Sequence, residues 1–262
     1  MMTSLKTFED IRYLVSDSLP ENDVVHGFFT RHGGVSDTPW DRLNLGRSVG
    51  DNPQHVAENR RRLLRSIGSS DSNVFDVWQV HSVSVIVAEK PNELGCVPQR
   101  ADAIITDKPG ILLMMRFADC VPILLYDPIR RVIGIVHAGW LGSVGKIVKI
   151  TIEKMQSQFK SNPADVLAVI GPSIAAHHYP VGDDVIVRVM NAYGEKASEL
   201  LSIENSNKQF DLWKANQFCL TEAGVNRIEV LGVCTVCSHT DWYSHRGDHG
   251  KTGRFGVVIG LR

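Results

Sequence analysis

Residues 101–138 read ADAIITDKPGILLMMRFADCVPILLYDPIRRVIGIVHA and carry the strongest structural signal in the chain. The stretch contains short apolar runs that are rich in β-branched residues, at 103–106, 111–115, 123–126 and 132–137. Each run has the length of a buried strand, and Gly, Pro or charged residues separate it from the next. The middle of the chain is therefore predicted to form the buried strands of a sheet.

Helical and strand patterns extend from this stretch in both directions. A stripe of apolar residues predicts a helix at 55–67. Further helices are predicted at 144–159, 183–192 and 213–223, and further strands at 24–30, 74–80, 83–89, 166–170, 229–232 and 255–261. Strands and helices do not alternate strictly, which disfavours a doubly wound sheet. The pattern instead predicts an α/β fold, a single domain with a mixed sheet and flanking helices.

The composition is that of a folded globular protein, with 43% hydrophobic and 22% charged residues among 262. No linker, repeat or low-complexity tract divides the sequence, so residues 1–262 are predicted to form one domain. The 28 Lys and Arg against 29 Asp and Glu lack the basic excess that a nucleic-acid binder needs. The longest apolar stretches meet charged residues before the roughly 20 residues of a membrane-spanning helix, so no membrane contact is expected.

The first residues and the cysteines bear on the compartment. Glu9 and Asp10 lie where an export signal would need its apolar centre, so a cytoplasmic protein is predicted. In a reducing cytosol the cysteines are expected to be thiols or metal ligands and not disulfides. They are Cys96, Cys120, Cys219, Cys234 and Cys237.

Three short motifs place metal-ligating residues at the ends of predicted strands: WQVHS at 78–82, ADCVP at 118–122 and VHAGW at 136–140. Their ligands are His81, Cys120 and His137. Two imidazoles and one thiolate suit a catalytic zinc with an open fourth position, and copper also accepts this set. Taken singly, each of the three could equally be an ordinary packed residue.

Asp119 adds weight to the functional interpretation of ADCVP. A carboxylate buried without a partner would cost several kcal/mol, so its place inside an apolar segment indicates a role. We predict that Asp119 is catalytic and either orients His81 or His137 or donates a proton to a leaving group.

These motifs occur in one order with HGFFTRHGGVS, NLG, ADAIIT, IGPSI, DLWKANQ, CTVCS and YSHRGDHGKTGR. Together, from about His26 to Leu261, they resemble the family once called multicopper polyphenol oxidoreductases or laccase-domain proteins. Its members are now described as purine nucleoside phosphorylases with adenosine deaminase side activity. The resemblance implies an α/β domain similar to a group of cysteine hydrolases and a toxin deamidase, a metal on His81, Cys120 and His137, and a possible homodimer.

Phosphorolysis requires a cradle for phosphate and a proton or positive charge near the departing purine. Two Gly-rich loops offer arginines for bidentate contact with phosphate, at 30–36 and 243–254. The first loop could instead be a glycine turn and the second a solvated loop. Arg60 belongs to a run of arginines on the helix predicted at 55–67, and such charge runs usually face solvent. The predicted substrate-binding residues are Arg31, Gly33, Gly34, Asn44, Arg60, Arg246 and Arg254.

A second group of potential ligands lies outside this set. Cys234 and Cys237 have the spacing of a redox motif or of half a zinc site, but no second CxxC exists, so structural packing is predicted. His177 and His178 stand where the family often has cysteines and an acidic residue. Adjacent residues in an extended segment face opposite sides, so at most one of the two histidines is expected to face the site.

Four functions compete. The favoured one is a zinc-dependent purine nucleoside phosphorylase, acting on adenosine, inosine or methylthioadenosine, with adenosine deaminase activity. A copper-dependent polyphenol oxidase would need histidines in HxH pairs, and none of the ten histidines forms one. A cysteine hydrolase or amidase would use Cys120 as nucleophile and His137 as base, with no metal on the thiolate. A non-enzymatic zinc-stabilised module would need a closed site.

Overall fold

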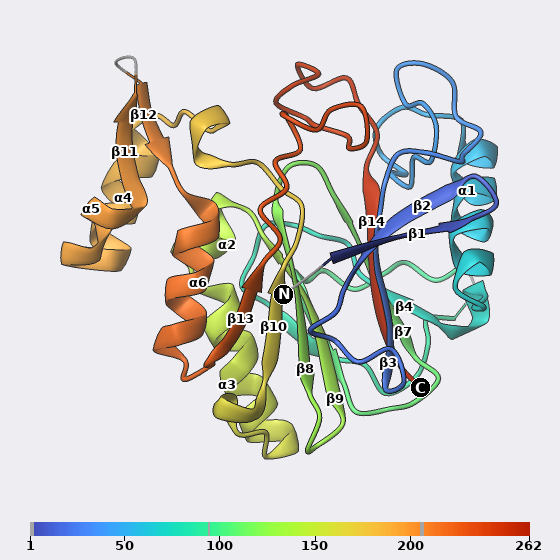
Figure 1. Cartoon of the computed structure of the whole chain (residues 1–262), viewed down its shortest axis with the longest axis horizontal. Coiled ribbons are helices and arrows are strands. Elements are labelled where there is room, and N and C mark those ends of the chain that lie inside the picture. The colour runs from blue at the N-terminus through green and yellow to red at the C-terminus, as the bar shows by residue number, and fades with distance from the viewer. Residues whose placement is uncertain (1–2, 94, 205–206) are drawn as a thin grey trace.

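The computed structural model describes residues 3–93, 95–204 and 207–262, and two six-stranded sheets lie at its centre (Figure 1). The first sheet has the order β1 (Thr3–Phe8), β2 (Ile11–Ser16), β3 (Val24–Phe29), β14 (Phe255–Leu261), β7 (Leu112–Phe117) and β4 (Val74–Asp76). The second has the order β13 (Arg227–Val230), β10 (Leu167–Ile170), β8 (Val121–Asp127), β9 (Val132–Ala138), β6 (Ala103–Thr106) and β5 (Val85–Val87). Each sheet mixes parallel and antiparallel pairs.

The mixed α/β class is therefore confirmed, and the structure divides the predicted mixed sheet into two. β7 and β8 follow each other closely in the sequence, yet they belong to different sheets. All seven residues of β8 are buried, because one face of the strand packs on the first sheet and the other on helices. When a strand is apolar on both faces, its sequence does not show what packs on each face, so it does not predict which sheet the strand joins.

The two sheets share a buried cluster. Leu113 of β7 and Val257 of β14 pack in it with Leu124 of β8 and Ile135 of β9. On the same two strands of the second sheet, Ile123 and other alternate residues point the opposite way into a second cluster. This shared core supports one domain over residues 1–262, which stays a prediction.

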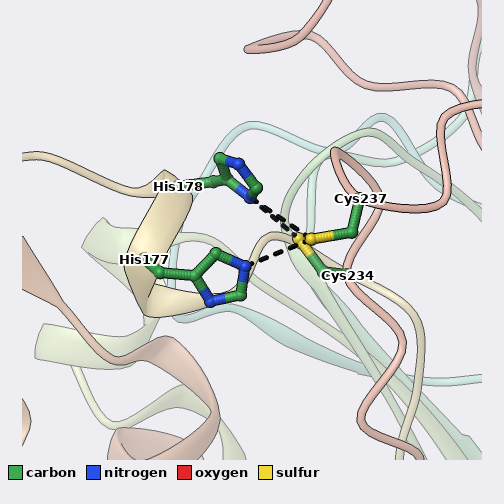
Figure 2. Close-up of side chains that lie close together, drawn as sticks. All are labelled: His177, His178, Cys234 and Cys237. Carbon is green, nitrogen blue, oxygen red and sulfur yellow. Dashed lines mark hydrogen bonds between the residues drawn. The ribbon is translucent and has the colours of Figure 1, made fainter.

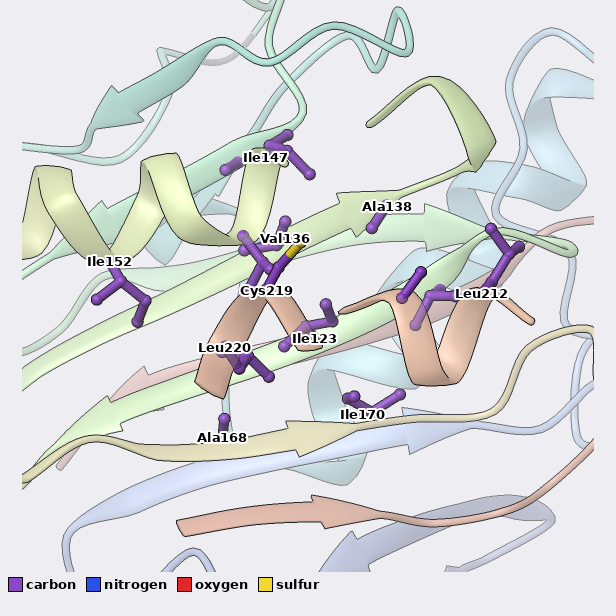
Figure 3. Packing of buried hydrophobic residues seen from close by; sticks show 14 of the residues in the cluster. Ile123, Val136, Ala138, Ile147, Ile152, Ala168, Ile170, Leu212, Cys219 and Leu220 are labelled. Carbon is purple, nitrogen blue, oxygen red and sulfur yellow. The ribbon is translucent and has the colours of Figure 1, made fainter. Parts of the chain in front are cut away.

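Helices cover the outer faces of both sheets, as Figure 1 shows. On the second sheet they are α2 (Trp140–Val144), α3 (Ile147–Phe159) and α6 (Leu212–Glu222), and α4 (Asp183–Tyr193) and α5 (Ala197–Leu200) pack against α2 and α6. In Figure 3, Cys219 and Leu220 of α6 lie over Ile123 and Ala168 of the sheet. On the first sheet, α1 (Pro53–Ser66) contributes Leu63 and Leu64 to a third cluster.

The remaining elements include parts that the sequence patterns missed. The hairpin of β1 and β2, the hairpin of β11 (Leu201–Glu204) and β12 (Asn207–Phe210), and α2 were not predicted. Short 3-10 turns occur at Asp71–Asn73, Pro163–Asp165, Ala176–His178 and Gly194–Lys196. The five cysteines form no disulfide with one another. Within the described ranges, no helix has the length and apolar character needed to cross a bilayer.

Candidate active site

A cavity of about 650 Å³ opens beside the segments that pass from one sheet to the other. This volume is typical of a site for a small organic molecule. Its wall combines potential metal ligands with aromatic and cationic groups. Prominent members are His81, Cys120, His137, Trp78, Phe117, Trp140, Tyr179, Asp119, Arg47, His245, Arg246 and Arg254.

His81, Cys120 and His137, here called the His–Cys–His cluster, lie together in this wall. Their ligand atoms are all within 4.8 Å of one another, and His81 Nε2 lies 3.8 Å from Cys120 Sγ. Zinc with bonds of about 2.0 Å to nitrogen and about 2.3 Å to sulfur would hold a nitrogen and a sulfur about 3.6 Å apart. The spacing and the donor chemistry of the cluster therefore fit a zinc ion.

Chain topology explains why ligands so far apart in the sequence meet. His81 lies on the connection from β4 of the first sheet to β5 of the second, and Cys120 lies on the connection from β7 to β8. His137 is the penultimate residue of β9, paired with Pro122 of β8. Both crossings pass the end of β9, and this brings the three ligands to one point.

Asp102, just before β6, orients both histidines of the cluster, and sequence reasoning missed it. Its carboxylate accepts a hydrogen bond from His137 Nδ1 at 2.8 Å, which leaves Nε2 of that ring for the cluster. It also accepts hydrogen bonds from the backbone N–H of His81 at 3.0 Å and of Ser82 at 2.6 Å. A carboxylate that fixes a ligating histidine is a common support of metal sites. The signal was present, since ADAIIT places a carboxylate directly before a buried strand.

The bonds to Asp102 also fix the backbone around His81. His81 has a φ of 59°, in the left-handed region that few residues other than glycine adopt. Burial alone would raise the pKa of Asp102, but the hydrogen bonds from His137 and Ser82 outweigh it and lower the pKa to about 2. Asp102 is therefore ionised and holds the loop of His81 in this conformation.

Charges inside the cluster favour the form of the thiol that binds metals. Burial alone would raise the pKa of Cys120, but the neighbouring His137 and His81 lower it to about 6. Burial alone would lower the pKa of His137, but Cys120 and the hydrogen bond to Asp102 raise it to about 9. Without metal, the cluster is thus a thiolate beside an imidazolium.

Gly139 provides the space that the cluster occupies. A Cβ atom at this position would lie 2.8 Å from Cys120 Sγ and 3.1 Å from His81 Cδ2. Both distances are shorter than ordinary contacts, so any larger residue would displace a ligand.

Asp119 does not orient His81 or His137, and that part of the prediction is wrong. Its Oδ1 accepts a hydrogen bond from Thr235 Oγ1 at 2.6 Å, and its Oδ2 accepts one from the backbone N–H of Arg246 at 2.8 Å. The carboxylate therefore ties the turn before Cys120 to two C-terminal loops, while Asp102 holds the histidines. Asp119 still lines the cavity, and its predicted catalytic role stays a prediction.

Arg246 and Arg254 line the cavity as the phosphate hypothesis requires. Arg254 donates through Nη1 to the backbone carbonyls of Thr252 and Gly253, at 3.2 and 2.8 Å. Burial lowers the pKa of Arg254 below its usual value, while Asp119 and Cys120 partly restore it. Asn44, outside the lining, accepts a hydrogen bond from the backbone N–H of Arg254 at 2.8 Å.

The other predicted substrate contacts lie outside the cavity lining, so the structure corrects their placement. Arg31 Nη2 lies 3.2 Å from Asp41 Oδ2, and the central carbon of the same guanidinium lies 4.7 Å from the centre of the Tyr243 ring. Gly33 has a φ of 86°, and a Cβ atom at Gly33 or Gly34 would collide with backbone atoms, so neither position has room for a side chain. Arg60 binds Asp71 and, at 2.9 Å, Asp76. These residues stabilise loops. The arginines of the cavity lining are instead Arg47, Arg116, Arg246 and Arg254, of which Arg116 is paired with Asp76 at 2.9 Å.

The fold and the site define a mixed α/β protein with a His–Cys–His cluster in the wall of a cavity between two sheets. The chain belongs to the family described as multi-copper polyphenol oxidoreductase laccase, whose sequence model matches residues 25–262. This confirms the family resemblance predicted from the motifs. Similarity to cysteine hydrolases and a toxin deamidase stays a prediction.

Individual relatives match over most of their length. The chain is 40% identical over 243 residues to a protein of Deinococcus radiodurans named purine nucleoside phosphorylase, covering 92% of this chain and 91% of that protein. It is 34% identical over 232 residues to the purine nucleoside phosphorylase YfiH of Escherichia coli, covering 88% and 91%. The crystal structure of YlmD from Geobacillus stearothermophilus superposes with a TM-score of 0.92 at 30% identity, covering 100% of both chains.

Proposed function

We propose that this chain is a zinc-dependent purine nucleoside phosphorylase, which cleaves a ribonucleoside with phosphate into a free purine and ribose 1-phosphate. The observation that carries the proposal is the cavity, because it combines the His–Cys–His cluster, cationic side chains and aromatic surfaces in one small-molecule site. The names of the relatives in Deinococcus radiodurans and Escherichia coli support the same reaction.

The aromatic part of the wall suits a purine. Trp78 lines the cavity and keeps 54% of its surface exposed, an unusual exposure for so large an apolar side chain. Trp140 and Phe117 lie in the same wall. Flat aromatic surfaces stack on nucleobases whatever their substituents, so this wall would accept adenosine, inosine and methylthioadenosine.

The cationic part of the wall suits phosphate. Among its described hydrogen bonds the Arg254 guanidinium uses only Nη1, so Nε and Nη2 are available for two parallel bonds to an oxyanion. Arg246 and Arg47 add positive charge nearby, and His245 is an imidazole at the cavity that could protonate the departing base. In the reaction, a phosphate oxygen forms a bond to the anomeric carbon, and the electron pair of the broken glycosidic bond leaves with the purine.

His81, Cys120 and His137 would hold the zinc, and Asp102 would fix the imidazole of His137 and the backbone of His81. When bound, zinc supplies a Lewis acid that stabilises negative charge in the site. Copper also suits this donor set, but one cluster with a thiolate and no HxH pair does not provide a multicopper centre. We therefore propose zinc, with copper as the alternative metal.

We further propose that the same site deaminates adenosine. Asp119 lies in the wall next to Cys120, where a carboxylate can pass a proton between water and the exocyclic amine. This activity would not require phosphate, so it can be separated from phosphorolysis by its products.

The first prediction tests the phosphorylase proposal. The purified chain with zinc should release purine from adenosine, inosine or methylthioadenosine only when phosphate is present, with ribose 1-phosphate as the second product. Chromatography of the base and of the sugar product, with and without phosphate, provides the measurement. Free ribose formed at the same rate without phosphate would show hydrolysis and overturn the proposal.

The second prediction concerns Arg254. Arg254→Gln should raise the phosphate concentration for half-maximal rate by about 10- to 150-fold, because one charge-assisted contact contributes about 1.5 to 3 kcal/mol. Arg254→Lys should recover only part of the loss, since an ammonium group cannot make two parallel bonds. Steady-state rates at varied phosphate check this.

The matched control for Arg254 is Arg61→Gln on α1. Arg61 is 66% exposed and pairs with Glu58 on the same helix, so its loss should not change the phosphate dependence. If Arg254→Gln behaves like this control, phosphate binds elsewhere in the cavity.

A further inference from the structure

Four potential metal ligands meet at a second point, away from the His–Cys–His cluster. His177, His178, Cys234 and Cys237, here called the His–His–Cys–Cys cluster, converge as Figure 2 shows. All four ligand atoms lie within 4.8 Å of one another. His177 Nε2 lies 3.2 Å from Cys237 Sγ, and His178 Nδ1 lies 3.5 and 3.6 Å from the sulfurs of Cys237 and Cys234.

We propose that this cluster is a second metal site, a closed tetrahedral zinc site of the Cys2His2 type. In such a site, zinc–ligand bonds of about 2.0 to 2.3 Å place nitrogen and sulfur about 3.6 Å apart. The three nitrogen–sulfur distances in the cluster, 3.2 to 3.6 Å, are close to this value. Four protein ligands leave no open position, so the zinc would stabilise the fold and perform no chemistry.

The local backbone lets two adjacent histidines reach one point. Residues Ala176–His178 form a 3-10 turn, so the extended segment that was assumed for these two histidines is not present. The two rings lie 4.5 Å apart, and His177 approaches through Nε2 while His178 approaches through Nδ1. Nε2 lies farther from the backbone than Nδ1. The two rings can therefore bring a nitrogen to the same point although the side chains leave the backbone in different directions.

The surrounding backbone holds the cysteines in place. The Ala175 N–H donates to Cys234 Sγ at 3.5 Å, a bond that stabilises a thiolate. The Thr235 N–H donates to the Ser173 carbonyl at 3.1 Å, so the segment before the histidines pairs with the CxxC turn. The two halves of the cluster, more than 50 residues apart in sequence, are therefore already joined by main-chain bonds.

A zinc ion here would support the wall of the active-site cavity. Thr235, between the two cysteines, holds Asp119 through its hydroxyl at 2.6 Å. Tyr179 follows His178, lines the cavity and lies under the Arg246 guanidinium at 5.1 Å. Metal at the His–His–Cys–Cys cluster would thus fix two contacts that shape the substrate site.

Zinc content tests the proposal without relying on activity. The expected count of two ions includes the zinc of the proposed function, and the Cys120→Ala chain isolates the second site. The wild-type chain, purified under reducing conditions and equilibrated with zinc, should hold about two ions per chain. Cys237→Ser and His177→Gln should each hold about one, since both residues are exposed and their replacement should leave the fold intact. Cys120→Ala should also hold about one, and Cys120→Ala combined with Cys237→Ser should hold none.

Cys96→Ser is the matched control, because Cys96 is an exposed free thiol outside both clusters. It should keep two ions per chain. Cobalt in place of zinc adds a second readout: the Cys120→Ala chain should show the spectrum of a tetrahedral site with two thiolates, and Cys237→Ser should remove it. A chelator should lower the melting temperature of Cys120→Ala but not that of the double variant.

Three results would overturn the proposal. One is a wild-type chain that holds a single zinc which Cys120→Ala removes. The second is a Cys237→Ser chain and a His177→Gln chain that both retain the wild-type zinc content. The third is a Cys234–Cys237 disulfide that persists in the reduced, zinc-equilibrated protein, which would assign the CxxC to redox chemistry.

Discussion

The Asp102→Asn chain should bind zinc at the His–Cys–His cluster about 10- to 100-fold more weakly than the wild type, the usual cost of losing a partner that orients a metal ligand. Asp102 accepts from His137 and from the backbone of both His81 and Ser82. An asparagine keeps one acceptor oxygen and turns an NH2 group toward donors, so at least one buried N–H loses its acceptor. The free energy of unfolding should fall by about 2 to 4 kcal/mol.

Chelator competition measures the zinc affinity, and urea unfolding measures the stability. Asp127→Asn is the matched control, because Asp127 is also fully buried and caps the turn at the opposite end of β8 by accepting from Ile129 and Arg130. That variant should lose stability but keep its zinc affinity. Equal zinc affinity in both variants would show that Asp102 supports the fold alone.

The Cys120→Ala chain should lose the zinc of the His–Cys–His cluster and turn over at roughly a thousandth of the wild-type rate or less, since a Lewis acid contributes several kcal/mol to such a reaction. The thiolate supplies the only negative charge among the three ligands, so its removal weakens the site most. Metal analysis and initial rates measure the two effects. Cys219→Ala, at a buried cysteine of α6, should leave both unchanged.

Metal removal separates this function from a cysteine hydrolase. The metal-free cluster pairs a thiolate with an imidazolium, the arrangement of a cysteine nucleophile and its base. If the chain were such a hydrolase, wild-type protein stripped of zinc would gain activity. The phosphorylase proposal requires the opposite: the stripped protein is inactive, and zinc restores it.

Much of the His–Cys–His cluster could be predicted because residue type carries its chemistry. Histidine and cysteine at the ends of apolar runs are rare enough to attract attention, and the structure does bring His81, Cys120 and His137 together. The strand at Ala103–Thr106 was likewise predicted at its observed bounds, since four buried residues with charged or polar neighbours leave few alternatives.

The rest depended on contacts distant in sequence. Nothing in the loop at 30–36 distinguishes an arginine that binds phosphate from one that binds Asp41, as Arg31 does. Asp102 became important only through His137, 35 residues later. The His–His–Cys–Cys cluster was missed because the 3-10 turn that aims both rings is too short to produce a sequence pattern.

His81 and Cys120 lie on two of the connections between the sheets, and this has a consequence for the order of assembly. A ligand placed within one strand or one helix could bind metal in a partly folded chain. Here the ligands converge only when both sheets have formed and packed, after closure of chain segments 39 and 17 residues long between successive ligands. If the cluster binds metal as proposed, binding would require both sheets, because a chain with one sheet formed would not bring the three ligands together.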